Sequence, residues 1–97
     1  MEREEIIKLY DIYGKLLTDK QQEYVEEYYY MDLSLSEIAD NHNISRNGVY
    51  DQINKATSLL EEYETKLHLC EKYKKISDLA LDDDAKAKIE DIIWGED

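Results

Sequence analysis

A short run of polar side chains near the middle of the sequence carries groups suited to recognising a nucleic acid. Arg46 can form paired hydrogen bonds with guanine, and Asn47 can do the same with adenine. Hydroxyl groups nearby, such as that of Tyr50, can contact phosphates. We therefore take six residues as the candidate nucleic-acid-binding set: Ser45, Arg46, Asn47, Tyr50, Asn54 and Lys55.

No comparable group of residues points to catalysis or metal binding. The chain lacks a glycine-rich phosphate loop and a recognisable nucleophile with its base, and its two histidines, His42 and His68, are far apart in sequence. The acidic run 82–84 lacks the further oxygen ligands and the glycine of a calcium loop. We expect no enzyme, no catalytic residue, no metal site, no cofactor and no small-molecule substrate.

The charge balance argues against a dedicated DNA-binding protein. The 97-residue chain has a formal net charge of -12, whereas DNA affinity comes largely from Lys and Arg at phosphates. From Thr18 to Leu60 there are three cations and eight anions, a net charge of -5. One anion, Asp51, lies on the face that would meet DNA, so tight specific binding would need dimerisation to double the contacts.

The polar run lies at the start of the second helix of an expected helix-turn-helix, over about Ser34 to Leu60. Ser34 with Glu37 forms a capping-box pattern, and Ser45 is a second N-cap. Asn43 tolerates the left-handed conformation that the turn requires. Ala39 is small where the two helices cross, and the apolar positions between them are Ile38, Ile44, Val49 and Ile53.

Helices are also expected on both sides of this motif. Apolar spacing predicts a first helix from about Glu4 to Leu16, and the Thr18 and Gln21 capping box begins a second that runs to about Met31. After the motif, one long helix is expected from Arg46 to about Ile76. A short last helix follows, capped by Asp82, with its apolar side in the range 85–94 and Gly95 as its stop.

The long helix carries a heptad seam with 4-3 spacing. Its members are Val49, Ile53, Ala56, Leu60, Tyr63, Leu67 and Cys70. Such a seam can pair with the same helix of a second subunit or accept the last helix of its own chain. Both arrangements remain open at this stage, and we expect a homodimer because a short chain buries a limited core alone.

The composition indicates an all-α protein with one domain over residues 1–97, in which 61–97 form a helical extension. There is no proline, only three glycines, and no alternating apolar segment beside the single Asn-Gly step. Neither a signal peptide nor an apolar run long enough to cross a bilayer is present, so we expect no membrane insertion. The single cysteine, Cys70, fits a reducing cytoplasm.

The segment from Leu17 to Leu60 resembles the C-terminal helix-turn-helix region of bacterial sigma factors. Over nearly the whole chain, the sequence is similar to the YlxM family of helix-turn-helix proteins. The similar features are Leu17-Thr-Asp-Lys-Gln-Gln, the tyrosine-rich end of the second helix, Ser34-Leu-Ser-Glu-Ile-Ala, Ile44-Ser-Arg-Asn-Gly-Val-Tyr-Asp and Leu60-Glu-Glu-Tyr-Glu-Thr-Lys-Leu. The chain departs from the pattern at His42, where an apolar residue is usual, and at Asp51, where sigma-like helices tend to be basic.

The resemblance implies a small cytoplasmic bacterial protein, encoded beside signal recognition particle components and acting with them or regulating them. Two functions stay open. In one, an acidic surface with exposed tyrosine, Tyr30 above all, binds a basic protein or ribonucleoprotein partner. In the other, the chain is a dimeric, sequence-specific DNA-binding regulator.

Overall fold

The structure, a computed structural model, describes residues 2–79 and 82–95, and every regular element in these residues is helical. The all-α prediction is confirmed. In chain order the elements are α1 (Arg3–Tyr13), the 3-10 turn η1 (Gly14–Leu16), α2 (Asp19–Val25), the π-helical turn η2 (Glu26–Tyr30), α3 (Leu35–His42), α4 (Arg46–Leu67), α5 (Leu69–Ser77) and α6 (Asp83–Trp94). None of the helices in this part of the chain is both long and apolar enough to span a membrane.

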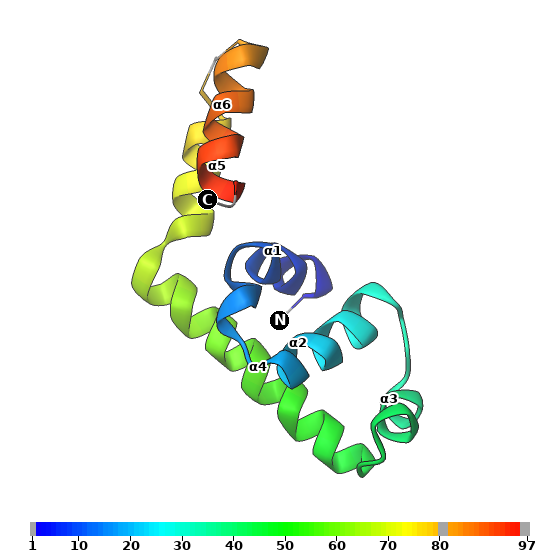
Figure 1. The fold of residues 1–97 in the computed structure, drawn as a ribbon. Helices are drawn as coiled ribbons and strands as arrows, with labels where there is room; N and C mark the ends of the chain where they lie inside the picture. Colours follow the sequence, from blue (N-terminus) through cyan, green and yellow to red (C-terminus); the bar gives the residue numbers. More distant parts are fainter. Residues whose placement is uncertain (1, 80–81, 96–97) are drawn as a thin grey trace.

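The body of the molecule is built on α4, with α1, α2 and α3 packed along one side of it (Figure 1). Its apolar core consists of two groups of buried side chains. The first joins α1 to the middle of α4 and contains Ile6, Leu9, Tyr13, Leu17, Val25, Ala56 and Leu60. The second joins α2 and α3 to the start of α4 and contains Tyr24, Ile38, Ala39, Val49 and Ile53.

The helix starts follow the sequence signals closely. Thr18 and Gln21 form a complete capping box, as do Ser34 and Glu37. The Ser45 side chain accepts a hydrogen bond from the N–H of Gly48, and the Asp82 side chain accepts one from the N–H of Ala85. Each start therefore lies where a polar oxygen satisfies N–H groups that have no partner within the helix.

The second helix departs from its predicted form over its last turn. It was expected to be regular to about Met31, but Glu26–Tyr30 form a π turn. Two residues after this turn, Asp32 has the left-handed φ of 56°. Arg3 of α1 explains how this turn is held, because its guanidinium donates to the carbonyl oxygens of Tyr28 and Tyr29 and pairs with Asp32. These carbonyls would otherwise lack partners at the helix end.

The prediction of one continuous helix from Arg46 to Ile76 is wrong. The helix breaks at His68, which has φ 55° and ψ 31°, so that α4 ends at Leu67 and α5 starts at Leu69 in a new direction. Glu64 accepts hydrogen bonds from the N–H groups of Cys70 and Glu71 at 3.0 and 3.2 Å. The helix break is thus stabilised by a carboxylate that caps the second segment.

The heptad seam is divided by this break. Its first four members, Val49, Ile53, Ala56 and Leu60, are buried against α1, α2 and α3 of the same chain. Both partners expected for them, a second subunit and the last helix, are therefore replaced by the body's own helices. The later members are less covered, since Tyr63 and Cys70 are half-buried and Leu67 is 45% exposed.

The C-terminal helices α5 and α6 form a two-helix arm that projects from the body (Figure 1). Their contact includes a hydrogen bond from the Tyr73 hydroxyl to Glu90 at 3.2 Å. The last helix packs on α5 and runs back toward α1, with Gly95 as its C-cap. The arm and the helix-turn-helix lie at opposite ends of an elongated molecule measuring 49 × 25 × 23 Å.

Candidate recognition interface

The turn between α3 and α4 has the geometry that the helix-turn-helix motif requires. Asn43 takes the left-handed conformation at φ 54°, and the N–H of Ile44 donates to the carbonyl of Ala39 at 3.1 Å. Ala39 is 6% exposed where the helices cross, and Val49 is fully buried. One assignment is corrected, because Ile44 was expected between the two helices and is 38% exposed at the turn.

All six candidate binding residues lie on the surface at the start of α4. Ser45, Arg46, Asn47, Tyr50, Asn54 and Lys55 are each exposed, Tyr50 by 53%. The helical spacing of Asn47, Tyr50 and Asn54 places them along one side of the helix, next to the side that Val49 and Ile53 bury. The structure thus places all six residues on the surface around the first turns of α4, with Asn47, Tyr50 and Asn54 in one row and Lys55 further round the helix, near Gln21.

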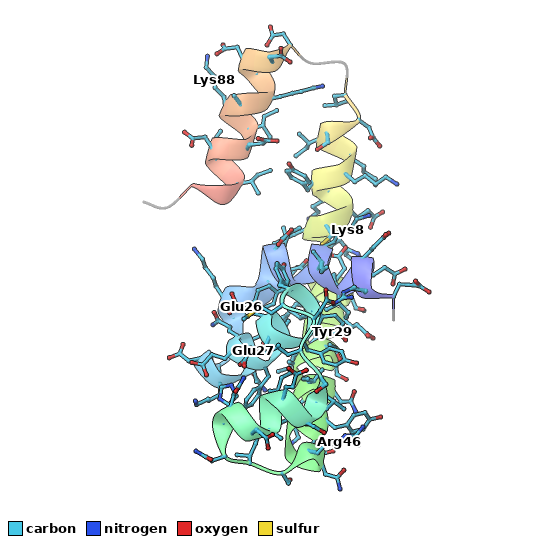
Figure 2. The ribbon with its side chains drawn as sticks, turned by 90° about the vertical axis from the view of Figure 1, so that its right-hand side faces the viewer. Lys8, Glu26, Glu27, Tyr29, Arg46 and Lys88 are labelled. Carbon is cyan, nitrogen blue, oxygen red and sulfur yellow. The ribbon has the colours of Figure 1, made fainter. Side chains whose placement is uncertain are left out.

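Arg46 is available for binding at the tip of the body (Figure 2). Within the described residues its guanidinium has no hydrogen bond or ion pair. Ser45 is less available, because its hydroxyl oxygen already accepts from Gly48 N–H at 2.9 Å, which leaves its proton and one lone pair for a ligand. The six candidate residues therefore offer a guanidinium, an ammonium group, amides and a phenol.

Acidic groups surround this face. Asp51 lies on α4 itself, and Asp40 lies on the preceding helix, both exposed to solvent. Arg46 and Lys55 are the cations of the two motif helices over residues 35–60. Because exposed charges act over a screening length of about 10 Å, these carboxylates oppose phosphate binding and favour a cationic ligand.

A polar contact holds α3 against the second helix, and sequence reasoning did not find it. The ring of His42 lies 2.5 Å from Glu27 through Nε2 and 3.7 Å from Glu23 through Nδ1. It also packs edge-on to Tyr24, with ring centroids 4.8 Å apart. Glu23 and Glu27 are one helical turn apart, and both contact His42, which stands where an apolar residue is usual. These three residues together were the signal in the sequence that could have predicted the contact.

The tyrosines divide between core and surface. Tyr13 and Tyr24 are buried, while Tyr28 and Tyr29 are half-buried and stack edge to face. Tyr30 is 46% exposed, as expected, but its hydroxyl donates to Asp11 at 2.9 Å. Most of the rings therefore supply core or packing surface, and Tyr50 lies on the candidate face.

Comparison with known proteins places the chain in a family. The family model described as "Putative helix-turn-helix protein, YlxM / p13 like" (UPF0122) matches residues 1–93. A UPF0122 protein of Fusobacterium nucleatum is 45% identical over 92 residues, covering 92% of this chain and 89% of that protein.

Two further relatives match a shorter stretch. A UPF0122 protein of Shouchella clausii is 54% identical over 65 residues, which are 67% of this chain and 60% of that protein. One from Staphylococcus epidermidis is 48% identical over 71 residues, 73% of this chain and 64% of that protein. The chain thus spans about 60% of the Shouchella relative's length. With the family model matching almost every residue, the chain belongs to the UPF0122 family of YlxM/p13-like helix-turn-helix proteins.

Proposed function

We propose that this chain is a non-enzymatic binding protein that acts as an accessory factor of the signal recognition particle in the bacterial cytoplasm. Its ligand is a basic protein surface within that ribonucleoprotein. We infer the particle from the resemblance to the YlxM family. We infer that the bound surface is basic from the acidic charges around α4.

The observation that carries this proposal is the electrostatic character of the helix-turn-helix. The face at the start of α4 is exposed and preorganised, yet the segment from Thr18 to Leu60 has a net charge of -5. Such a surface accelerates encounters with a cationic partner and slows encounters with a bare phosphate backbone. A helix-turn-helix fold does not itself determine which ligand binds, so we infer the class of ligand from the surface charges.

A second candidate function is DNA binding by the same face. It is favoured by one observation, the solvent-exposed Arg46 beside Asn47 at the free N-terminal end of α4. In that case α4 enters the major groove and the two side chains contact base edges. Two copies of the chain would be needed to supply enough phosphate contacts.

Titrations with the reconstituted particle, its protein, its RNA and random DNA distinguish the two functions. They are run at about 50 and 200 mM salt with wild type, Arg46→Ala and Lys66→Ala. Lys66 is a matched control because it is exposed and belongs to the same helix at its far end. The proposal predicts saturable binding to the particle and to its protein, with Arg46→Ala no weaker than Lys66→Ala.

A different set of titration results would support DNA binding, the second candidate function. Binding to DNA that falls with salt, and that Arg46→Ala but not Lys66→Ala weakens about tenfold or more, would identify a groove contact. Failure to bind the particle and its protein at the lower salt concentration would overturn the primary proposal.

A further inference from the structure

The arm formed by α5 and α6 carries apolar surface but buries none of its described side chains. Tyr73, Ile76 and Ile89 are half-buried between the two helices. Leu69 is 42% exposed and Ile92 is 81% exposed. Isolated helices of 9 and 12 residues are marginal in water, so an arm that projects from the body needs more apolar contact than its two helices supply.

The apolar residues of the arm have the spacing of helix-bundle seams. In α5 the residues with this spacing are Leu69, Tyr73 and Ile76, and in α6 they are Ala85, Ile89 and Ile92. Both sets follow a 4-3 pattern, which places a stripe along one side of each helix. Two such stripes facing each other fill half of a four-helix core. Helix α1 contacts α5, where Cys70 packs against the core of the body, but Leu69 and Ile92 stay largely exposed.

The charges of the arm identify what completes this core. Helix α5 contains three lysines and one glutamate, a net charge of +2. Helix α6 contains two lysines and four carboxylates, a net charge of -2. When two arms come together with each α5 between two α6 helices, every neighbouring pair around the bundle has opposite charge.

We propose that the arm is a dimerisation element, and that a second copy of this chain docks arm on arm to form a four-helix bundle. The partner arm is complementary because it presents the same two stripes and the same two charges, as a twofold interface requires. The contact lies far from the recognition face, since Arg46 and Lys88 are at opposite ends of the molecule (Figure 2). Dimerisation therefore leaves both recognition faces free, and it does not depend on which ligand they bind.

Analytical ultracentrifugation of the chain without any ligand tests this proposal, with Ile92→Lys and Leu16→Lys as a matched pair of variants. Both residues are exposed apolar side chains, Leu16 by 59%, but Leu16 belongs to the body. Neither substitution disturbs the buried core, so circular dichroism should show the helices of the body unchanged in both variants, and Ile92→Lys should lose at most the helical signal of the arm. We expect wild type and Leu16→Lys to sediment as two chains, and Ile92→Lys to shift to the mass of one.

A charge exchange gives an independent readout. Lys72→Glu/Lys74→Glu/Lys75→Glu makes both arm helices acidic, and Glu90→Lys/Asp91→Lys makes both basic. Each variant alone should be monomeric, and an equimolar mixture should recover the mass of two chains. A monomeric wild type would overturn the proposal, as would a dimer that Ile92→Lys leaves intact or a mixture that stays monomeric. None of these outcomes depends on ligand binding, so they are separable from a failure of the proposed function.

Discussion

The side chain of Glu64 in α4 connects this helix to α1 and α5 by hydrogen bonds. Its carboxylate accepts a hydrogen bond from the Tyr13 hydroxyl at 2.6 Å and from the N–H groups at the start of α5. Burial acts to raise the pKa of Glu64, but these hydrogen bonds outweigh it, and the pKa lies below its usual value. Burial, followed by the hydrogen bond to Glu64, raises the pKa of Tyr13 to about 12. At neutral pH the pair is therefore a carboxylate and a neutral phenol.

Burial and the same carboxylate together lower the reactivity of Cys70. Burial, and then the nearby charge of Glu64, raises the pKa of the Cys70 thiol to about 11. Because the thiolate is the nucleophile and only a small fraction of the thiol is ionised at neutral pH, Cys70 should react slowly there. The sequence suggested a small apolar role for this residue, and the raised pKa agrees with it.

Alkylation of Cys70 by iodoacetamide should therefore rise with pH along a curve whose midpoint is near 11. Since the folded pKa is raised, the folded chain should react more slowly than the denatured chain from neutral pH up to that midpoint. The denatured chain in urea is the control and should show a midpoint of about 8.5. Glu64→Gln removes the charge and should lower the midpoint of the folded chain. A folded midpoint equal to the denatured one would contradict this account.

At the scale of elements, the break between α4 and α5 depends on His68. A side chain with a Cβ in the left-handed region costs about 1–2 kcal/mol, and glycine is the residue usually found at such a helix end. Here tertiary contacts offset the cost, because the N–H of Leu69 donates to the Tyr13 hydroxyl at 3.0 Å.

His68→Gly should therefore stabilise the protein by about 0.5–1 kcal/mol, after allowing for the greater freedom of glycine in the unfolded chain. Glu61→Gly is the matched control in the interior of α4, where glycine should destabilise by about the same amount. Urea unfolding of the two variants measures both values. If His68→Gly is as destabilising as Glu61→Gly, the chain does not break at this residue.

Local signals in the sequence were enough to place four of the helix starts and the turn. Thr18, Ser34, Ser45 and Asp82 cap their helices as predicted, and Asn43 adopts the left-handed turn conformation. These features depend on residues within four positions of one another. The six polar residues of the candidate face were placed correctly on the surface for the same reason, because helical spacing alone decides which side is exposed.

The features that the sequence did not reveal depend on distant residues. The break at His68 occurs inside an unbroken heptad pattern and is held by Tyr13, which is 51 positions before Glu64. The π turn is held by Arg3 from α1. The contact of His42 with Glu27 needs α3 already packed on the second helix. In each case a side chain from another element outweighs the local pattern.

At the scale of the whole molecule, the two surfaces that we propose to bind partners lie at opposite ends. The helix-turn-helix presents its exposed face at one end, and the apolar arm projects at the other (Figures 1 and 2). The molecule extends 49 Å along its main axis, so a ligand at the start of α4 does not compete with a partner on the arm. In the proposed assembly, one dimer presents two recognition faces, so a ligand that offers two contact points would be bound more strongly than by one chain.

One measurement tests the central claim most directly. The affinities of wild type and of Asp40→Asn/Asp51→Asn are compared, for the protein of the signal recognition particle and for random DNA. Both carboxylates are exposed beside the recognition face, and Glu4→Gln/Glu5→Gln on α1 removes the same charge at a distance. Exposed ion pairs contribute about 0.2–1 kcal/mol each, so removing two should weaken binding to a basic protein about 2- to 30-fold. The account predicts this loss for the recognition-face variant alone, together with unchanged or stronger binding to DNA. Unchanged affinity for the protein, with a gain for DNA only, would contradict the account and identify the face as a DNA-binding surface.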